Sequence, residues 1–146
     1  MSKNSPFEEN LPKNQANYSP LTPLSFLTRT AEVFPERTAV IHGEIKRNWR
    51  ETLKRCTRLA SALKKKGVVQ GTTVSVMAPN VPELLEANFG VLMTGGVLNA
   101  LNIRLEAETL AYILEHGESQ ALITDREFSP VIQKVLQQLE DPPLVI

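Results

Sequence analysis

Residues 73–101 read TVSVMAPNVPELLEANFGVLMTGGVLNAL. The segment Thr73–Met77 is rich in β-branched residues and alternates little between apolar and polar, which predicts a strand covered on both faces. Residues 79–82 form a proline-rich turn, whose second proline suits the first position of a helix that stops at Gly95-Gly96. Val97–Leu101 is apolar again. A strand, a helix and a second strand in this order are typical of a parallel α/β sheet.

The same alternation continues to the end of the sequence. We expect a helix over Ala107–His116, closed by Gly117, then a strand over Ala121–Thr124 and a helix between Phe128 and Leu139. Leu144-Val145-Ile146 opens a further apolar strand, so strand starts recur roughly every two dozen residues, as in consecutive strand–helix units. Ligands of doubly wound sheets bind in the loops that follow the strands. The loop that would follow this last strand is therefore expected to be missing.

The residues before this sheet add a long helix and a hairpin. Asn48 and Glu51 have the spacing of a capping box, which predicts a helix start, and Gly67 predicts the end of that helix. Thr38–His42 and Ile45–Arg47 are β-rich and flank a glycine turn, which predicts a small hairpin. The predicted fold class is therefore α/β: a parallel sheet with flanking helices plus a small β-hairpin, truncated at its last strand.

The N-terminal residues are expected to differ from the rest. Residues 1–20 are polar and carry three prolines, which predicts a flexible polar tail. Order is expected to begin at Thr22-Pro23, a helix cap followed by a proline, and this first helix is expected to end near Phe34. Residues 21–146 are therefore predicted to form one domain.

Composition places the chain among ordinary globular proteins, with 42% hydrophobic and 22% charged residues. Sixteen basic and sixteen acidic side chains give a formal net charge of zero, which predicts no attraction to nucleic acid or to an anionic membrane. The run Lys64–Lys66 lies at the end of a predicted helix, where solvated cations suit the negative end of the helix dipole. A phosphate-binding patch is the alternative.

Cysteine use and hydropathy bear on the cellular compartment. The single cysteine, Cys56, falls on the apolar face of a predicted helix, which favours a buried structural thiol over a nucleophile. One cysteine forms no intrachain disulfide, which fits a reducing compartment. The longest nearly apolar stretch, residues 89–98, is too short to span a bilayer. These features predict a cytoplasmic protein without a transmembrane segment, while a C-terminal targeting signal on a longer parent is left open.

Polar residues that follow the predicted strands are the candidates for chemistry. Asn99, Asn102 and Arg104 lie at the end of one strand, and Asp125-Arg126-Glu127 follows the next. Ligands contact such residues at the edge of an α/β sheet. Turn formation and backbone hydrogen bonding are favoured over ligand contact for Asn99, Asn102 and Arg104, and helix capping is favoured for Asp125, with Glu127 in the first turn.

Other signals of catalysis are weak. Gly95-Gly96 precedes a strand rather than a helix, so it predicts a helix end rather than a phosphate loop. His42 and His116 lack metal-ligand spacing, and Trp49 predicts a core anchor. We therefore assign no catalytic, cofactor-binding or metal-binding residue from the sequence.

Four segments carry a resemblance to a known family. They are Asn48–Thr52, Ser75–Glu83, Gly95–Leu105 and Ile123–Phe128. The first and third resemble the two early core motifs of the AMP-forming acyl-activating enzymes, the acyl-CoA synthetases, and the second resembles their strand and Pro-Asn-x-Pro turn. The Asn-x-x-Asn-x-Arg-Leu variant within the third segment is similar to medium-chain fatty acyl-CoA ligases and plant-type acyl-activating enzymes. Arg47-Asn48 departs from the family, which usually has an aromatic residue followed by Thr or Ser.

The resemblance implies that residues 21–146 are a partial N-terminal AMP-binding domain, incomplete at its C-terminus. It implies a full-length parent that uses ATP, Mg and CoA. In this family a fatty or related carboxylate attacks the α-phosphate of Mg-ATP to give an acyl-adenylate and pyrophosphate, and the CoA thiol then displaces AMP. The family's phosphate loop, its Tyr-Gly-x-Thr-Glu segment, its ribose-binding Asp and its C-terminal lysine do not occur in this sequence.

We therefore expect the fragment alone to be inactive and to bind none of these cofactors productively. The first alternative is a standalone, non-catalytic α/β binding module that associates with full-length synthetases. An independent nucleotide-binding protein is a weaker alternative. Acyl chain length is open, and an oligomer is compatible with the sequence.

Overall fold

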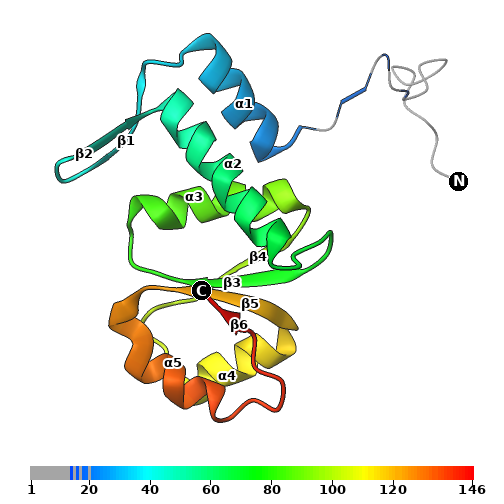
Figure 1. Cartoon of the computed structure of the whole chain (residues 1–146), viewed down its shortest axis with the longest axis vertical. Coiled ribbons are helices and arrows are strands. Elements are labelled where there is room, and N and C mark those ends of the chain that lie inside the picture. The colour runs from blue at the N-terminus through cyan, green and yellow to red at the C-terminus, as the bar shows by residue number, and fades with distance from the viewer. Residues whose placement is uncertain (1–13, 15, 17, 20) are drawn as a thin grey trace, which may run out of the picture.

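A computed structural model describes residues 14, 16, 18, 19 and 21–146 (Figure 1). The flexible tail predicted for residues 1–20 lies outside the described residues, apart from four positions. The elements are α1 (Pro23–Val33), β1 (Thr38–His42), β2 (Ile45–Asn48), α2 (Trp49–Lys65), β3 (Thr73–Met77), α3 (Pro82–Gly90), the 3-10 helix η1 (Leu92–Thr94), β4 (Val97–Ala100), α4 (Ala107–His116), β5 (Ser119–Thr124), the 3-10 helix η2 (Arg126–Phe128), α5 (Ser129–Leu136) and β6 (Leu144–Val145).

The main sheet has the strand order β4-β3-β5-β6, and all neighbouring strands run parallel. The helices α2 and α3 cover one face, and α4 and α5 cover the other (Figure 1). The chain leaves β3 toward β4 through α3 and leaves β5 toward β6 through α5, on the opposite face. This is the doubly wound arrangement expected for consecutive strand–helix units. The predicted fold class is confirmed.

Each face of the sheet has its own hydrophobic core. Under α4 and α5 the core includes Met77, Leu110 and Leu122, and under α2 and α3 it includes Leu63, Val74 and Val76. Strand β3 therefore contributes to both cores, which explains why its sequence is apolar without alternation. Full burial of a side chain of this size stabilises the fold by about 1.5–3 kcal/mol.

The hairpin and the long helix form as the sequence predicts. Strands β1 and β2 pair antiparallel, with Gly43 in the left-handed conformation at the turn (φ +56°). Asn48 caps α2 and accepts a hydrogen bond from the Glu51 amide, while the Glu51 carboxylate accepts one from the Asn48 amide. Both hydrogen bonds of the capping box are present, and Gly67 (φ +93°) follows the helix end.

Two predicted helices are shorter than expected. The helix predicted to reach Gly95-Gly96 ends at Gly90 and continues as η1. Gly90 faces α2 so closely that a Cβ there would lie 2.7 Å from the Leu59 side chain. The helix predicted from Phe128 to Leu139 is confined to α5, which follows a separate 3-10 turn capped by Asp125 and ends at Leu136.

One further expectation requires correction. Trp49 is only partly buried and belongs to neither core cluster, so it is not the predicted core anchor. Gly117 ends α4 as predicted; its φ is −82°, and the left-handed residue beside it is Glu118 at φ +50°. Gly117 is needed for a different reason: a Cβ there would lie 2.9 Å from the Ile113 carbonyl oxygen and 3.4 Å from the Asn99 amide nitrogen.

Candidate functional site

The carboxyl ends of β3 and β5 form the candidate site, because the chain turns in opposite directions from these two adjacent strands. Ligands of doubly wound sheets bind in the crevice at such a switch point. The two strand ends are joined by a hydrogen bond from the Asp125 amide to the Met77 carbonyl oxygen, at 3.1 Å. This hydrogen bond therefore fixes the ends of β3 and β5 relative to each other.

The polar residues at this edge serve mainly to shape its loops. The Asn102 side-chain oxygen accepts a hydrogen bond from the Arg104 amide at 3.0 Å, and the Asp125 carboxylate accepts one from the Glu127 amide at 3.1 Å. The expected roles in turn formation and capping are confirmed. Asn80, Arg104 and Arg126 are exposed at the same edge. Their arrangement provides no nucleophile with an adjacent base.

Asn99 lies away from this edge, in a polar cluster within the sheet. Its side-chain amide donates a hydrogen bond to the Ser75 hydroxyl at 3.0 Å, and the Ser75 and Ser119 hydroxyls lie 2.6 Å apart. The three residues belong to β4, β3 and β5, so the cluster ties the three neighbouring strands together. Both serines are buried, and each has a partner, as buried hydroxyls require. The role of Asn99 is structural.

A second polar cluster joins the hairpin, α2 and α3, and the sequence alone did not indicate it. Glu86 is buried, and one of its carboxylate oxygens accepts hydrogen bonds from Arg47 and Arg55, each at 2.5 Å. Glu83 accepts longer hydrogen bonds from the same two arginines, at 3.2 and 3.3 Å. Arg47, at which the sequence departs from the motif described above, makes two of these ion pairs. No pattern in the sequence pairs these glutamates with arginines that lie 28 to 39 residues earlier.

The contacts within this cluster shift the pKa of Glu83 and of Arg55. Burial of Glu83 opposes its ionisation, but a backbone hydrogen bond and the two arginines lower its pKa below the ordinary value. The hydrogen bond to Glu86 raises the pKa of Arg55, against the effect of its own burial. The cluster is therefore a fixed ion-pair network.

The remaining sequence candidates carry no site chemistry. Cys56 is fully buried, and burial together with the nearby Glu86 carboxylate raises its pKa to about 11, as expected for a structural thiol. The His116 ring stacks on Tyr112 at 5.4 Å in the last turn of α4. Lys64–Lys66 are exposed at the end of α2. Across the described ranges, no group of three or more His, Cys, Asp or Glu residues could hold a metal ion.

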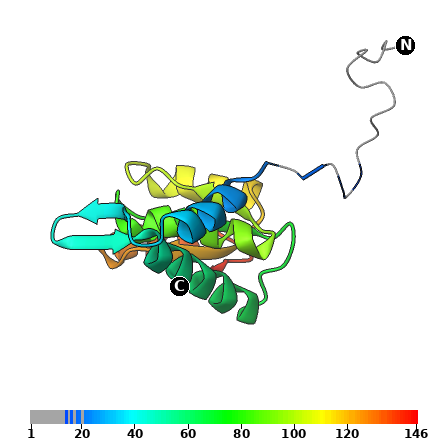
Figure 2. The same ribbon diagram turned by 90° about the horizontal axis from the view of Figure 1, so that it is seen from above.

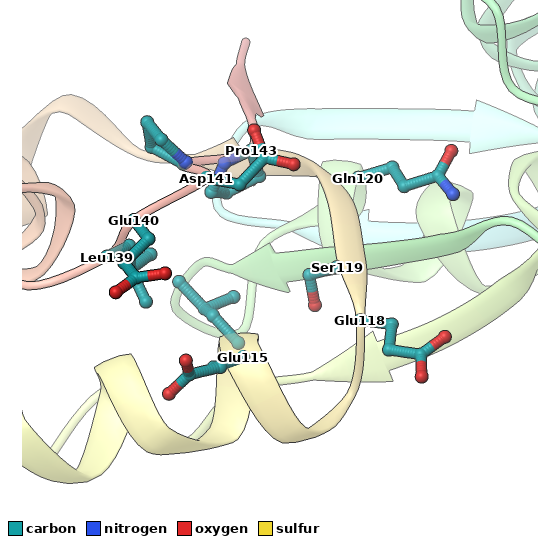
Figure 3. Close-up of a pocket in the computed structure, with 10 residues that line it drawn as sticks. Glu115, Glu118, Ser119, Gln120, Leu139, Glu140, Asp141 and Pro143 are labelled. Atoms are coloured by element: carbon teal, nitrogen blue, oxygen red, sulfur yellow. The ribbon is translucent and has the colours of Figure 1, made fainter.

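The most enclosed hollow lies at the opposite edge of the sheet (Figure 3). Its volume is about 450 Å³, and it is lined by residues from the end of α4, the start of β5 and the loop before β6. Glu115, Glu118, Glu140 and Asp141 make it acidic. A smaller hollow of about 340 Å³ lies between the hairpin and α3, next to Asn80. Neither hollow contains a cation that would hold a phosphate group.

The fold and its motifs define an AMP-forming acyl-activating domain, and comparison with known proteins supports this class. The model of the family described as AMP-binding enzyme matches residues 27–146. The chain is 48% identical over 133 residues to the peroxisomal acetate/butyrate–CoA ligase AAE7 of Arabidopsis thaliana, over 91% of this chain and 23% of that protein. It is 46% identical over 145 residues to the acetate–CoA ligase CCL3 of Humulus lupulus, over 94% of this chain and 26% of that protein.

Solved structures show the same fold. A putative long-chain-fatty-acid CoA ligase from Rhodopseudomonas palustris matches with a TM-score of 0.78 and 29% identity, over 86% of this chain and 33% of that one. The anthranilate CoA ligase AuaEII in complex with anthranoyl-AMP matches with a TM-score of 0.78 and 25% identity, over 84% of this chain and 24% of that one.

The chain belongs to the AMP-binding enzyme family and corresponds to the N-terminal portion of an AMP-forming acyl-CoA synthetase. It spans about a quarter of the length of these two curated relatives. Several relatives are named as peroxisomal. In the described part of the chain, no helix is long and apolar enough to cross a membrane.

Proposed function

We infer that this chain forms the N-terminal part of an ATP-dependent ligase that joins a fatty or related carboxylic acid to CoA. The observation that carries this inference is the family match over residues 27–146, together with 46–48% identity to the acetate/butyrate–CoA and acetate–CoA ligases. In the parent reaction, the acid's carboxylate oxygen bonds to the α-phosphorus of Mg-ATP and pyrophosphate leaves. The CoA sulfur then bonds to the acyl carbon and AMP leaves.

The described residues do not fit the binding of Mg-ATP or CoA. At the carboxyl edge, the side chains of Asn102 and Asp125 are engaged in a turn and in capping. No lysine stands on a glycine-rich loop before a helix, which is the usual cradle for a triphosphate. We therefore assign no catalytic or nucleotide-binding residue to this chain. Its role in the parent is to form the scaffold of the sheet and its switch point.

Three finer statements belong to the proposal. Residues 21–146 act as a partial AMP-binding domain, and residues 1–146 alone do not adenylate acids. The cytoplasm is the compartment that the composition supports, and the peroxisome is the alternative suggested by the relatives that are named for it. A fusion of the chain to a fluorescent protein at its N-terminus, expressed from its complete reading frame, distinguishes the two compartments.

A chimera tests the proposed scaffold role. Residues 21–146 replace the matching stretch of the Arabidopsis acetate/butyrate–CoA ligase, and acid-dependent pyrophosphate release is measured with acetate and butyrate. We expect the chimera to retain activity within about tenfold of the intact ligase, because the exchanged residues hold the fold rather than the substrates. A soluble, folded chimera without activity would contradict the proposal and favour the standalone binding module.

A further inference from the structure

The zero net charge of the chain conceals a division of charge between its halves. Residues 21–72 carry eleven Lys or Arg and four Asp or Glu, whereas residues 73–146 carry three Lys or Arg and ten Asp or Glu. The first half forms α1, the hairpin and α2, and the second forms the sheet with α3, α4 and α5. Figure 1 shows α1 and the hairpin at one end of the molecule and α4 and α5 at the other, with α2 and α3 packed together between them. The expectation drawn from net charge alone, that nothing attracts the chain to an anionic membrane, therefore does not follow.

The surplus cations are concentrated on the outward side of α2. Arg50, Lys54, Arg58 and Lys65 follow one another at helical spacing on the side opposite the buried residues Thr52, Cys56 and Leu63. Within the described residues, only Arg47, Arg50 and Arg55 of this half form ion pairs. Lys54, Arg58 and Lys65 are exposed and unneutralised, so the stripe retains its positive charge.

The hairpin extends this charged surface. Lys46, Lys54 and Arg58 line one hollow of about 470 Å³ between β2 and α2, which places the hairpin and helix cations on a common face. Two carboxylates share the hollow, and one of them, Glu51, is engaged in the capping box. We call the surface formed by Lys46, Lys54, Arg58 and Lys65 the cationic face.

Exposed apolar side chains lie in the same half of the chain, and Ile45 lines the hollow that holds Lys46, Lys54 and Arg58. Ile41 and Ile45 of the hairpin expose 67% and 40% of their surface. Phe26 and Val33 expose 58% and 57% on the side of α1 opposite Leu27 and Ala31, which are buried. Figure 2, viewed from this end of the molecule, shows α1, the hairpin and α2 together, with the hairpin projecting beyond the body. Folding of the described residues leaves these side chains in water.

We propose that the cationic face and the hairpin tip dock on an anionic lipid bilayer. Cations beside exposed aliphatic and aromatic side chains are the combination that binds peripheral proteins to such surfaces. The lysines and arginines are attracted by acidic headgroups, Ile41 and Ile45 enter the headgroup region, and the acidic half points away from the bilayer. The separation of charge orients the molecule, because an anionic bilayer attracts the basic half and repels the acidic half.

Vesicle binding by the chain of residues 1–146 tests this proposal. The protein is sedimented with sucrose-loaded vesicles of phosphatidylcholine alone, or with roughly one-third phosphatidylserine, at about 50 mM and about 500 mM salt. We expect binding to the phosphatidylserine vesicles at low salt, weakened by at least about tenfold at high salt, and little binding to phosphatidylcholine alone. Equal binding to both vesicles, or none, overturns the proposal.

Matched charge reversals test the face itself. Lys54→Glu with Arg58→Glu is compared with Arg126→Glu with Lys134→Glu, a pair of exposed cations in the acidic half that changes the net charge equally. We expect the first pair to lose at least about tenfold in binding and the second to change it little. Ile41→Ser with Ile45→Ser should weaken binding while leaving its salt dependence in place. Circular dichroism confirms that each variant is folded.

The outcomes separate the bilayer from a protein partner. If both charge-reversed pairs lose binding equally, overall charge rather than this face is responsible, and the proposal is wrong. As a final control, the protein is sedimented without vesicles to detect self-association. Salt-sensitive self-association that Lys54→Glu with Arg58→Glu abolishes would show that the face binds the acidic half of a second copy, and this too would overturn the lipid proposal.

Discussion

The guanidinium of Arg47 donates a hydrogen bond to the buried carboxylate of Glu86 at 2.5 Å, joining residues 39 positions apart. Arg47 lies on β2 and Glu86 on α3, so this pair fixes the hairpin to the helix that follows β3. Arg55 of α2 donates to the same carboxylate oxygen. Three elements that precede or flank the sheet thus meet at one carboxylate, whose charge is compensated by two arginines.

Removal of Arg47 should destabilise the fold more than removal of an exposed arginine. Arg47→Ala leaves the buried Glu86 with one partner, and we expect a loss of about 1–3 kcal/mol in the free energy of unfolding. Arg50→Ala is the matched control, because Arg50 pairs with Glu36 at 2.8 Å where both side chains are exposed. Its loss should stay below about 1 kcal/mol. Urea denaturation measures both, and equal losses would show that burial of Glu86 does not matter.

Stability should fall on acidification because of Glu83. Its pKa in the folded state is lower than the ordinary value of 4.5, so folding favours the ionised carboxylate. The stabilisation is present above the unfolded pKa and is lost as the pH falls through the folded pKa. Glu83→Gln should therefore flatten the decline in melting temperature below about pH 4.5. If the melting temperature of Glu83→Gln declines on acidification as steeply as that of the unsubstituted protein, Glu83 is not the cause of the decline.

Two neighbouring substitutions at the end of α4 should have opposite effects. Glu118 has φ +50°, so Glu118→Gly relieves backbone strain and should stabilise the fold by up to about 1 kcal/mol. Gly117 has an ordinary φ, but Gly117→Ala places a methyl group 2.9 Å from the Ile113 carbonyl oxygen. That overpacking should cost about 1–3 kcal/mol. Thermal melts of the two variants measure these changes, and the same sign for both would refute this description of the turn.

The thiol of Cys56 should be unreactive in the folded protein. Burial raises its pKa to about 11, and the side chain is fully covered. We expect a thiol reagent at pH 8 to label native protein at least about a hundredfold more slowly than protein in urea. Since the unfolded thiol ionises near pH 9 and the folded thiol does not, the stabilisation from this group should be lost between pH 9 and about 11. Rapid labelling of native protein would place Cys56 outside the core.

Local signals predicted much of this fold, and contacts between distant residues explain the differences. The Asn48–Glu51 capping box and the apolar strand Thr73–Met77 depend on neighbours in the sequence, and both form as predicted. The end of α3 at Gly90 and the left-handed conformation of Glu118 were not predicted; Gly90 lies close to Leu59 of α2, and Gly117 lies close to Asn99 of β4. No pattern of composition or spacing records such contacts.

The side-chain clusters around the candidate site show the same difference between local and long-range contacts. Capping by Asp125 is local and was predicted, whereas the ion pairs of Glu86 require the hairpin and two helices to be in place. The charge division between residues 21–72 and 73–146 was present in the sequence, but the net charge of zero concealed it. Counting charge by segment rather than over the whole chain would have revealed it.

The central claim is that this chain supplies the scaffold of an acyl-CoA ligase and none of its nucleotide chemistry. Acid-dependent pyrophosphate release from Mg-ATP tests it most directly, measured on residues 1–146 alone with acetate, butyrate and a longer fatty acid, and beside the chimeric ligase. The account predicts no release above the acid-free control from the chain alone and sustained release from the chimera. Turnover by residues 1–146 alone would contradict it.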